Sequence, residues 1–155
     1  SQVLINDVII NELKEVSRLH NNANCRVCLH TSPDSLHHDM IILERKDSYL
    51  RPHKHIYASG ETFHVIEGVM AVLSFDDKGN VFDSPRLQKG DLYRISKGVY
   101  HALFPISDYI IYHENKVGPF LGQKDNIYAD WSPENDDLDG IKFYKKNLVE
   151  RLNSH

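Results

Sequence analysis

Apolar and polar residues follow two different periods along this chain. Near the N-terminus Ile9, Leu13 and Val16 recur every three or four positions, which predicts a helix over about residues 6–20. Asn6 or Asp7 can cap that helix. From about residue 26 to 117 the apolar period becomes two, which is typical of strands with one buried face.

The middle of the chain reads as a series of short strands. Gly-containing turns separate them every 8–12 residues or so, which predicts an all-β sandwich or barrel. An extended segment over 48–55 surrounds Pro52, which suits a strand start or a sheet edge. The other predicted strands are 26–30, 39–45, 61–66, 69–75, 81–87, 92–95, 100–105 and 108–115.

A second helix is expected at the C-terminal end. After Gly118-Pro119 the pattern is irregular up to Trp131, and Ser132-Pro133-Glu134 then has the cap, proline and acid of a helix start. The helix is predicted over about 133–153, with an apolar stripe that covers the outside of the barrel: Ile141, Tyr144, Leu148 and Leu152. We expect residues 1–155 to form a single domain.

Composition narrows the classes of function. The chain is 41% hydrophobic and 26% charged with a net charge of −4, and its basic residues are scattered, which argues against nucleic acid or a membrane as partner. No apolar run approaches the roughly 20 residues that span a bilayer. Residues 1–11 lack the features of a secretory signal, so a cytoplasmic location is expected.

Four residues in three separate places have the chemistry of a metal site. His53 and His55 lie two apart in the extended segment and project to the same side, and His101 and Glu61 add a third imidazole and a carboxylate. Three neutral nitrogen donors with one anionic oxygen suit a mononuclear divalent metal: Zn, Fe, Mn or Ni. Only a closed β-structure would bring these residues together.

Three further residues are candidates for catalysis. Arg51 has the parity of His53, so it either points into the same cavity and pairs with an anion or is a surface arginine before a proline. Glu114 and Lys116 share parity on or just past the last predicted strand. They would supply a general base and a cation, or else form a solvent-facing ion pair.

The remaining cysteines and histidines have weaker signals. Cys25 and Cys28 form a C-x-x-C pair, which is a redox pair, half a zinc site or simply two half-buried thiols in a strand. His64 lies an odd number of residues from Glu61 and should face outward, and His37-His38 are expected near the rim of the barrel.

The spacing of these residues resembles the two cupin motifs. The first is His53-x-His55, five residues, Glu61, six residues, Gly68; the second is Gly90, five residues, Ser96-x-Gly98, two residues, His101. The gap of five before Glu61 is longer than the usual three or four, with the extra residue in the loop 57–60. The resemblance implies a small double-stranded β-helix, or jelly-roll barrel, whose metal ligands are His53, His55, Glu61 and His101.

Further segments resemble the WbuC-type cupin-fold metalloproteins: Arg51-Pro52-His53, the hairpin Phe75–Gly79, His113–Pro119 and Trp131-Ser132-Pro133. That resemblance covers most of the chain and implies a role in bacterial surface-polysaccharide (O-antigen) synthesis, with a homodimer by analogy. The reaction of that family is undefined.

Three hypotheses of function follow. The first is a metal-dependent enzyme acting on a sugar or nucleotide-sugar by Lewis-acid isomerisation, epimerisation or hydrolysis. The second is a non-haem Fe(II) protein that activates oxygen, since His and carboxylate ligands suit iron equally well. The third is a non-catalytic, metal-dependent sensor or binding module for a small molecule, possible for any fold of this kind.

Overall fold

The protein is a two-sheet β-structure with a helix at each end. The computed structural model describes residues 2–57, 60–124 and 126–153. Its helices are α1 (Asp7–Leu19), the 3-10 turn Gly122–Lys124 and α2 (Leu138–Asn153). Its strands are β1 (Cys25–Cys28), β2 (His37–Arg45), β3 (His53–Lys54), β4 (Gly60–Glu67), β5 (Val69–Phe75), β6 (Val81–Asp83), β7 (Arg86–Gln88), β8 (Leu92–Ser96), β9 (Tyr100–Pro105), β10 (Tyr109–Val117) and β11 (Ile127–Tyr128).

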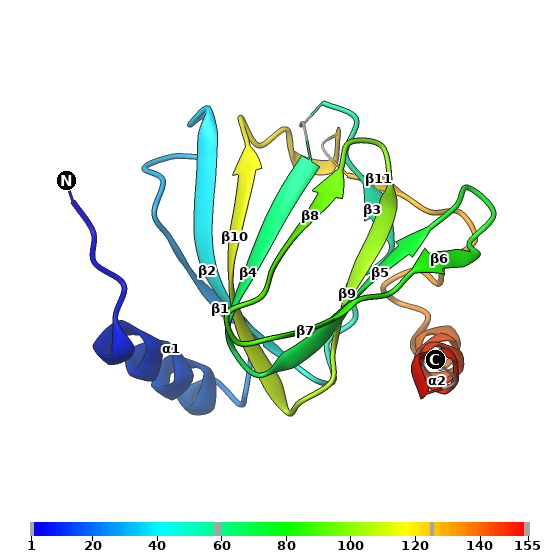
Figure 1. Ribbon diagram of the computed structural model, residues 1–155, viewed down its shortest axis with the longest axis horizontal. Coiled ribbons are helices and arrows are strands. Elements are labelled where there is room, and N and C mark those ends of the chain that lie inside the picture. The colour runs from blue at the N-terminus through cyan, green and yellow to red at the C-terminus, as the bar shows by residue number, and fades with distance from the viewer. Residues whose placement is uncertain (1, 58–59, 125, 154–155) are drawn as a thin grey trace.

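The two sheets face one another across the core (Figure 1). The first has the order β1-β2-β10-β4-β8 and the second β11-β3-β9-β5-β6, with β7 pairing to β5. All of these pairs are antiparallel, and strands distant in sequence, such as β2 and β10, are neighbours. This connectivity brings β3, β4 and β9 together, although their residues are spread over more than fifty positions.

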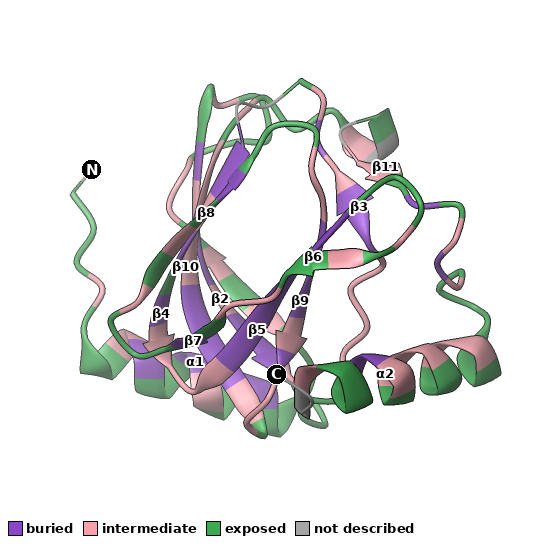
Figure 2. Ribbon diagram, turned by 45° about the vertical axis from the view of Figure 1, so that its right-hand side comes forward, coloured by how far each residue is buried: buried purple, intermediate pink, exposed green. Residues whose placement is uncertain are grey.

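The core between the sheets comes from the inward side of the period-two pattern. On the first sheet Phe63, Val65 and Tyr112 face inward, and on the second sheet Met70 and Leu103 meet them. The buried residues follow the strands, while the turns and the outward helix faces are exposed (Figure 2). Burial of this apolar area is the main driving force for closing the two sheets on each other.

Helix α1 confirms the N-terminal prediction and covers the outer face of the first sheet. The side chain of Asn6 accepts hydrogen bonds from the backbone amides of Val8 and Ile9, which makes Asn6 the cap. Ile10 and Leu13 then pack against a second cluster that includes Leu43. None of the described helices is long and apolar enough to cross a membrane.

Helix α2 packs on the outer face of the second sheet, but it begins later than predicted. Leu148 is buried against Leu73 and Phe75, as the apolar stripe indicated. The helix starts at Leu138 rather than near residue 133, because Ser132 donates its hydroxyl to the carbonyl of Ala129 and does not act as a cap. Asp137 takes the capping role and accepts from the amide of Gly140.

Two other boundaries differ from the sequence prediction. The single strand expected over 81–87 is two short strands, β6 and β7, because Pro85 lies between them and has no amide for a continuous ladder. The region between Gly118 and Trp131 is not wholly irregular. It contains the short strand β11, which pairs with β3 and thereby supports the segment that carries His53.

Candidate metal centre

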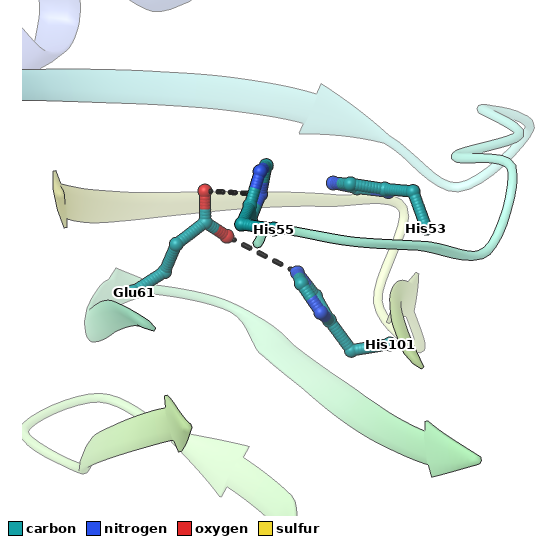
Figure 3. Close-up of side chains that lie close together, drawn as sticks. All are labelled: His53, His55, Glu61 and His101. Carbon is teal, nitrogen blue, oxygen red and sulfur yellow. Dashed lines mark hydrogen bonds and ion pairs between the residues drawn. The ribbon is translucent and has the colours of Figure 1, made fainter. Parts of the chain in front are cut away.

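The structure brings His53, His55, Glu61 and His101 together inside the barrel. His53 lies on β3 directly opposite His101 on β9, His55 follows β3, and Glu61 extends from β4 of the other sheet. Figure 3 shows the four side chains converging, with the carboxylate of Glu61 between His55 and His101. One ligand atom from each residue lies within 4.8 Å of the others, so the group could hold one metal ion.

The cluster is buried and closely spaced. Nε2 of His55 is 2.9 Å from Oε1 of Glu61, and Nε2 of His101 is 3.1 Å from Oε2. Only 1–6% of the surface of each of the four residues is exposed. A buried carboxylate among imidazoles requires compensation for its lost hydration, and the contacts to it supply part of that compensation.

Backbone carbonyls fix the orientation of two of the rings. Nδ1 of His53 is 3.0 Å from the carbonyl oxygen of Arg51, and Nδ1 of His101 is 3.0 Å from that of Val99. A carbonyl oxygen only accepts, so both Nδ1 atoms carry a hydrogen and donate it. The Nε2 atoms are then left with lone pairs, which is the usual arrangement of metal-binding histidines.

This tautomer gives a direct test of whether a metal fits. With Nδ1 protonated, neutral His101 presents an Nε2 lone pair to a carboxylate oxygen 3.1 Å away, and two acceptors at that distance repel. Either an extra proton on the ring or a cation shared by nitrogen and oxygen removes the repulsion. A donor set of three imidazoles and one carboxylate suits such a cation, so the residues fit a divalent metal.

The pKa values follow from burial and from these contacts. Burial, with the neighbouring His101 ring adding to it, lowers the pKa of His53 to about 3, so this ring is neutral near pH 7. Burial alone would raise the pKa of Glu61, but the contacts of its carboxylate with the rings of His101 and His55 hold that pKa well below its usual range. The site therefore favours deprotonated ligands, as metal binding requires.

Gly60 allows Glu61 to reach the centre. Its φ is +113°, and a Cβ atom at this position would overlap the carbonyl oxygen of Ile95 on β8. A glycine is therefore required where β4 enters the sheet, one residue before the carboxylate. The longer gap between His55 and Glu61 does not remove Glu61 from the cluster; residues 58 and 59 of that loop lie outside the described residues.

A cavity of about 620 Å³ extends from the cluster through the barrel. Glu114 and Lys116 of β10 line it from the inner face of the first sheet. Lys116 Nζ lies 3.4 Å from Oε1 of Glu61, and only 10% of its side chain is exposed, so the alternative of a solvent-facing ion pair does not hold. The shared parity of the two residues predicted their common face correctly.

Sequence reasoning missed a hydrogen-bonded pair that lines this cavity, Tyr112 and Glu44. Tyr112 has the parity of Glu114 and Lys116, which was the available signal, and its hydroxyl donates to Oε2 of Glu44 at 3.3 Å. Glu44 stands at the end of β2, where a continuous apolar run gave no reason to expect a buried acid. Both residues lie on the same wall as Glu114.

The two carboxyl groups on this wall are weaker acids than an exposed glutamic acid. Burial raises the pKa of Glu114 to about 8, with repulsion from Glu61 adding to the shift and Lys116 opposing it. Burial likewise raises the pKa of Glu44 to about 7, against the hydrogen bond from Tyr112. At neutral pH Glu114 therefore keeps a proton that it is able to donate.

Arg51 does not join the metal cluster. Its guanidinium donates to the carbonyl of Ala129 and to the hydroxyl of Ser132, each at 3.2 Å, and lies 5.3 Å from the ring centre of Tyr128. Glu134 is a further partner at 3.6 Å. Arg51 therefore lies neither in the cavity nor on the surface. Its side chain connects the segment that precedes β3 to the C-terminal segment, and its backbone carbonyl orients the ring of His53.

The other cysteines and histidines take ordinary places. Cys25 and Cys28 are free thiols on β1; Cys25 packs toward α1, and Cys28 lines the barrel cavity, so they face opposite ways and form neither a redox pair nor a metal pair. His64 is exposed on the outer face, as its parity predicted. His38 is buried and hydrogen-bonded to the carbonyl of Pro33, and His37 faces outward beside Asp39.

Comparison with solved structures defines the class of fold. An uncharacterized conserved protein with a double-stranded β-helix domain from Klebsiella pneumoniae subsp. pneumoniae MGH 78578 matches with a TM-score of 0.57 and 17% identity, over 84% of this chain and 98% of that one. Oxalate decarboxylase from Bacillus subtilis matches with a TM-score of 0.53 and 17% identity, over 68% of this chain. CapF, solved with an inhibitor, 3-isopropenyl-tropolone, matches with a TM-score of 0.56 and 15% identity, over 66% of this chain.

The protein therefore has the all-β fold of a cupin, a double-stranded β-helix with terminal helices, as its motifs predicted. The chain spans only 27% of the oxalate decarboxylase chain and 30% of the CapF chain, so these likenesses establish the fold and not an activity. A sequence profile described as a domain of unknown function, DUF6016, matches residues 5–87, just over half of the chain, and the chain belongs to that family. No curated protein matches the chain.

Proposed function

We propose that the chain is a mononuclear metal-dependent enzyme that acts on a sugar or nucleotide-sugar. The observation that carries the proposal is the buried cluster of His53, His55, Glu61 and His101 at the end of a cavity large enough for a small molecule. The assignment to surface-polysaccharide synthesis is supported by the resemblance of the chain's motifs to WbuC-type cupins.

In this proposal the four clustered residues hold the metal, and the inner face of β10 supplies the remaining chemistry. When bound, the metal would act as a Lewis acid on a carbonyl or hydroxyl oxygen of the substrate. Glu114 is the proton donor or acceptor, because its raised pKa keeps it near the balance between its two forms at neutral pH. Lys116 places a positive charge beside Glu61, where a developing negative charge on substrate oxygen would gain from it.

Isomerisation or epimerisation is the reaction class that this arrangement supports best. Both reactions move a proton next to a polarised carbonyl, and both need one acid–base group close to the metal. Glu114, half-buried and with its pKa raised to about 8, has the required environment. Arg51 is a positioning residue in this account, since its backbone carbonyl and not its guanidinium contacts the site.

The test is turnover of a panel of nucleotide-sugars and free sugars by metal-loaded protein in D₂O. NMR would follow deuterium incorporation at carbon as well as product formation. Glu114→Gln should lower the rate by about 100-fold or more while leaving the metal content unchanged. Glu12→Gln on the exposed face of α1 is the matched control and should have no effect.

Two outcomes would contradict the proposal. In the first, metal-loaded protein neither binds nor converts any member of the panel. In the second, a reaction occurs but Glu114→Gln proceeds at the wild-type rate, which would remove the acid–base role assigned to that residue.

A further inference from the structure

The mouth of the barrel cavity at β1 contains a cation that the metal chemistry does not use. Arg26 lies on β1, the edge strand of the first sheet, and its side chain lines the same cavity as Glu61 and His101. Within the part of the chain that the structure describes, Arg26 forms no ion pair. An arginine without a carboxylate partner at a cavity mouth is available to an anionic ligand.

The direction of the Arg26 side chain is informative. Arg26 pairs with Ile42, so Glu44 is its diagonal neighbour toward one end of the barrel and Met40 its diagonal neighbour toward the other. Nη1 lies 3.8 Å from the sulfur of Met40, while the carboxylate of Glu44 accepts from Tyr112. The guanidinium therefore leans away from the nearest acid and toward the end of the barrel that holds the histidines.

Strand register gives the span between the two ends. Met40 on β2 pairs with Glu114 on β10, which in turn pairs with Phe63 on β4, two residues after Glu61. The path from β1 to β4 crosses three strand spacings, about 14 Å in all. The side chains reach inward from both ends, so the gap between the guanidinium and the cluster is shorter, on the order of 10 Å.

We propose that Arg26 binds the anionic group of the substrate whose reacting end lies at His53, His55, Glu61 and His101. This inference rests on the proposed function and narrows it: the substrate is an anionic, elongated sugar derivative. Its phosphate or carboxylate is held at the mouth by the forked donors of the guanidinium. Its hydroxyl or carbonyl oxygens reach the metal end past Glu114.

Charge distribution along the cavity supports this orientation. The carboxyl groups that line it are on β2, β4 and β10, whereas β1 contributes Arg26 and Cys28 and no acid. An anion placed at the cluster would meet the carboxylate of Glu61, while on β1 the charged side chain that lines the cavity is the guanidinium of Arg26. The substrate therefore enters with its neutral end first.

The experiment measures binding by calorimetry to the metal-loaded protein. The probes are glucose 1-phosphate, glucuronate and glucose, and the first two separate a phosphate site from a carboxylate site. At least one anionic probe should bind ten-fold or more tightly than glucose, and Arg26→Gln should abolish that advantage without changing the metal content. Arg86→Gln, an exposed arginine on β7 outside this cavity, is the control and should leave binding unchanged.

A second readout uses Cys28, which lies two residues from Arg26 and lines the same cavity. In a Cys25→Ser background Cys28 is the sole thiol, and its alkylation by iodoacetamide can be followed by mass spectrometry. The anionic probe should slow this alkylation several-fold in protein that retains Arg26, and not in Arg26→Gln. This measurement also works on metal-free protein.

The two arms distinguish failure of the inference from failure of the proposed function. If the chain binds no metal, the proposed function fails, and protection of Cys28 alone decides the anion site. If metal binds but no anionic probe is preferred over glucose, or Arg26→Gln keeps the preference, the role of Arg26 is overturned. The role of Arg26 is also overturned if no probe binds and no probe protects Cys28 from alkylation.

Discussion

The Glu61 carboxylate is the residue on which the candidate centre depends, because two imidazoles and an ammonium group all contact it. Its position is set by the preceding glycine, whose backbone conformation is one that L-residues rarely adopt. Two consecutive residues thus set both features: Gly60 allows the backbone conformation at the start of β4, and Glu61 supplies the carboxylate of the centre.

Gly60→Ala should therefore cost more than an ordinary positive-φ substitution. A Cβ there would overlap the carbonyl of Ile95, so strain and overpacking together should cost roughly 3–5 kcal/mol and displace Glu61. Gly90→Ala is the matched control. It has a φ of +93° but open space around it, and should cost about 1–2 kcal/mol. The measurement is the free energy of unfolding in denaturant. If Gly60→Ala and Gly90→Ala lose equal amounts of it, the contact with Ile95 is unimportant.

Glu44 makes stability depend on pH in a predictable direction. Its pKa is about 7 in the folded protein against an ordinary value of 4.5, so between those pH values the unfolded chain loses a proton that the folded chain keeps. Stability from this group is therefore present at low pH and falls as pH rises through the window, by at most roughly 3 kcal/mol.

Glu44→Gln should remove that fall, since the amide is neutral at every pH and still accepts from Tyr112. The measurement is the free energy of unfolding of both proteins from pH 5 to 8, in the presence of a chelator. The variant should gain stability relative to the wild type as pH rises. A difference that does not change with pH would mean that Glu44 ionises as freely in the folded protein as in the unfolded chain.

At the scale of elements, the short strand β3 depends on its partners. It has only two residues, His53 and Lys54, and it is held between β9 and β11. Arg51 adds a side-chain connection to Ala129 and Ser132, which follow β11. The C-terminal segment thereby supports the strand that supplies the first imidazole of the cluster.

Arg51→Gln should weaken metal binding without removing a ligand. The lost hydrogen bonds to Ala129 and Ser132 should cost roughly 1–3 kcal/mol of stability, and looser placement of His53 should weaken metal affinity by about 10-fold. Lys54→Gln on β3 breaks a contact to Asp77, whose side chain is 85% exposed, and should cost less than about 1 kcal/mol. Metal titration and thermal unfolding of both variants would show the difference, and equal metal affinities would contradict the role of Arg51.

Across the whole molecule, the features that could be predicted from the sequence are those that depend on the periodicity of apolar residues and on the spacing of motifs. The period-two pattern located the strands, the stripe through Leu148 placed α2 against the barrel, and the two motifs identified the four residues that converge. Parity also put Glu114 and Lys116 on the inner face, because the pairing of β10 with β4 is regular from Tyr112 onward. Regular geometry over several residues makes such inferences reliable.

The sequence prediction failed where tertiary contacts decide. Arg51 lies outside the two-residue strand β3, so its parity with His53 carried no information about direction. Ser132 stands where the sequence predicts a helix cap, but its hydroxyl is used elsewhere. It donates to the carbonyl of Ala129 and accepts from the guanidinium of Arg51, which is 81 positions away in the chain. Glu44 is buried at the end of an apolar strand, and only the closed barrel shows that it faces the cavity.

The central claim is that His53, His55, Glu61 and His101 hold one metal ion. The most direct test is elemental analysis of protein purified without a histidine tag or chelator, beside the His53→Ala/His101→Ala variant and a His64→Ala control on the outer face of β4. The account predicts about one divalent metal per chain in the wild type and the control, and almost none in the double variant. No metal in the wild type, even after reconstitution, or equal metal in the double variant, would contradict it.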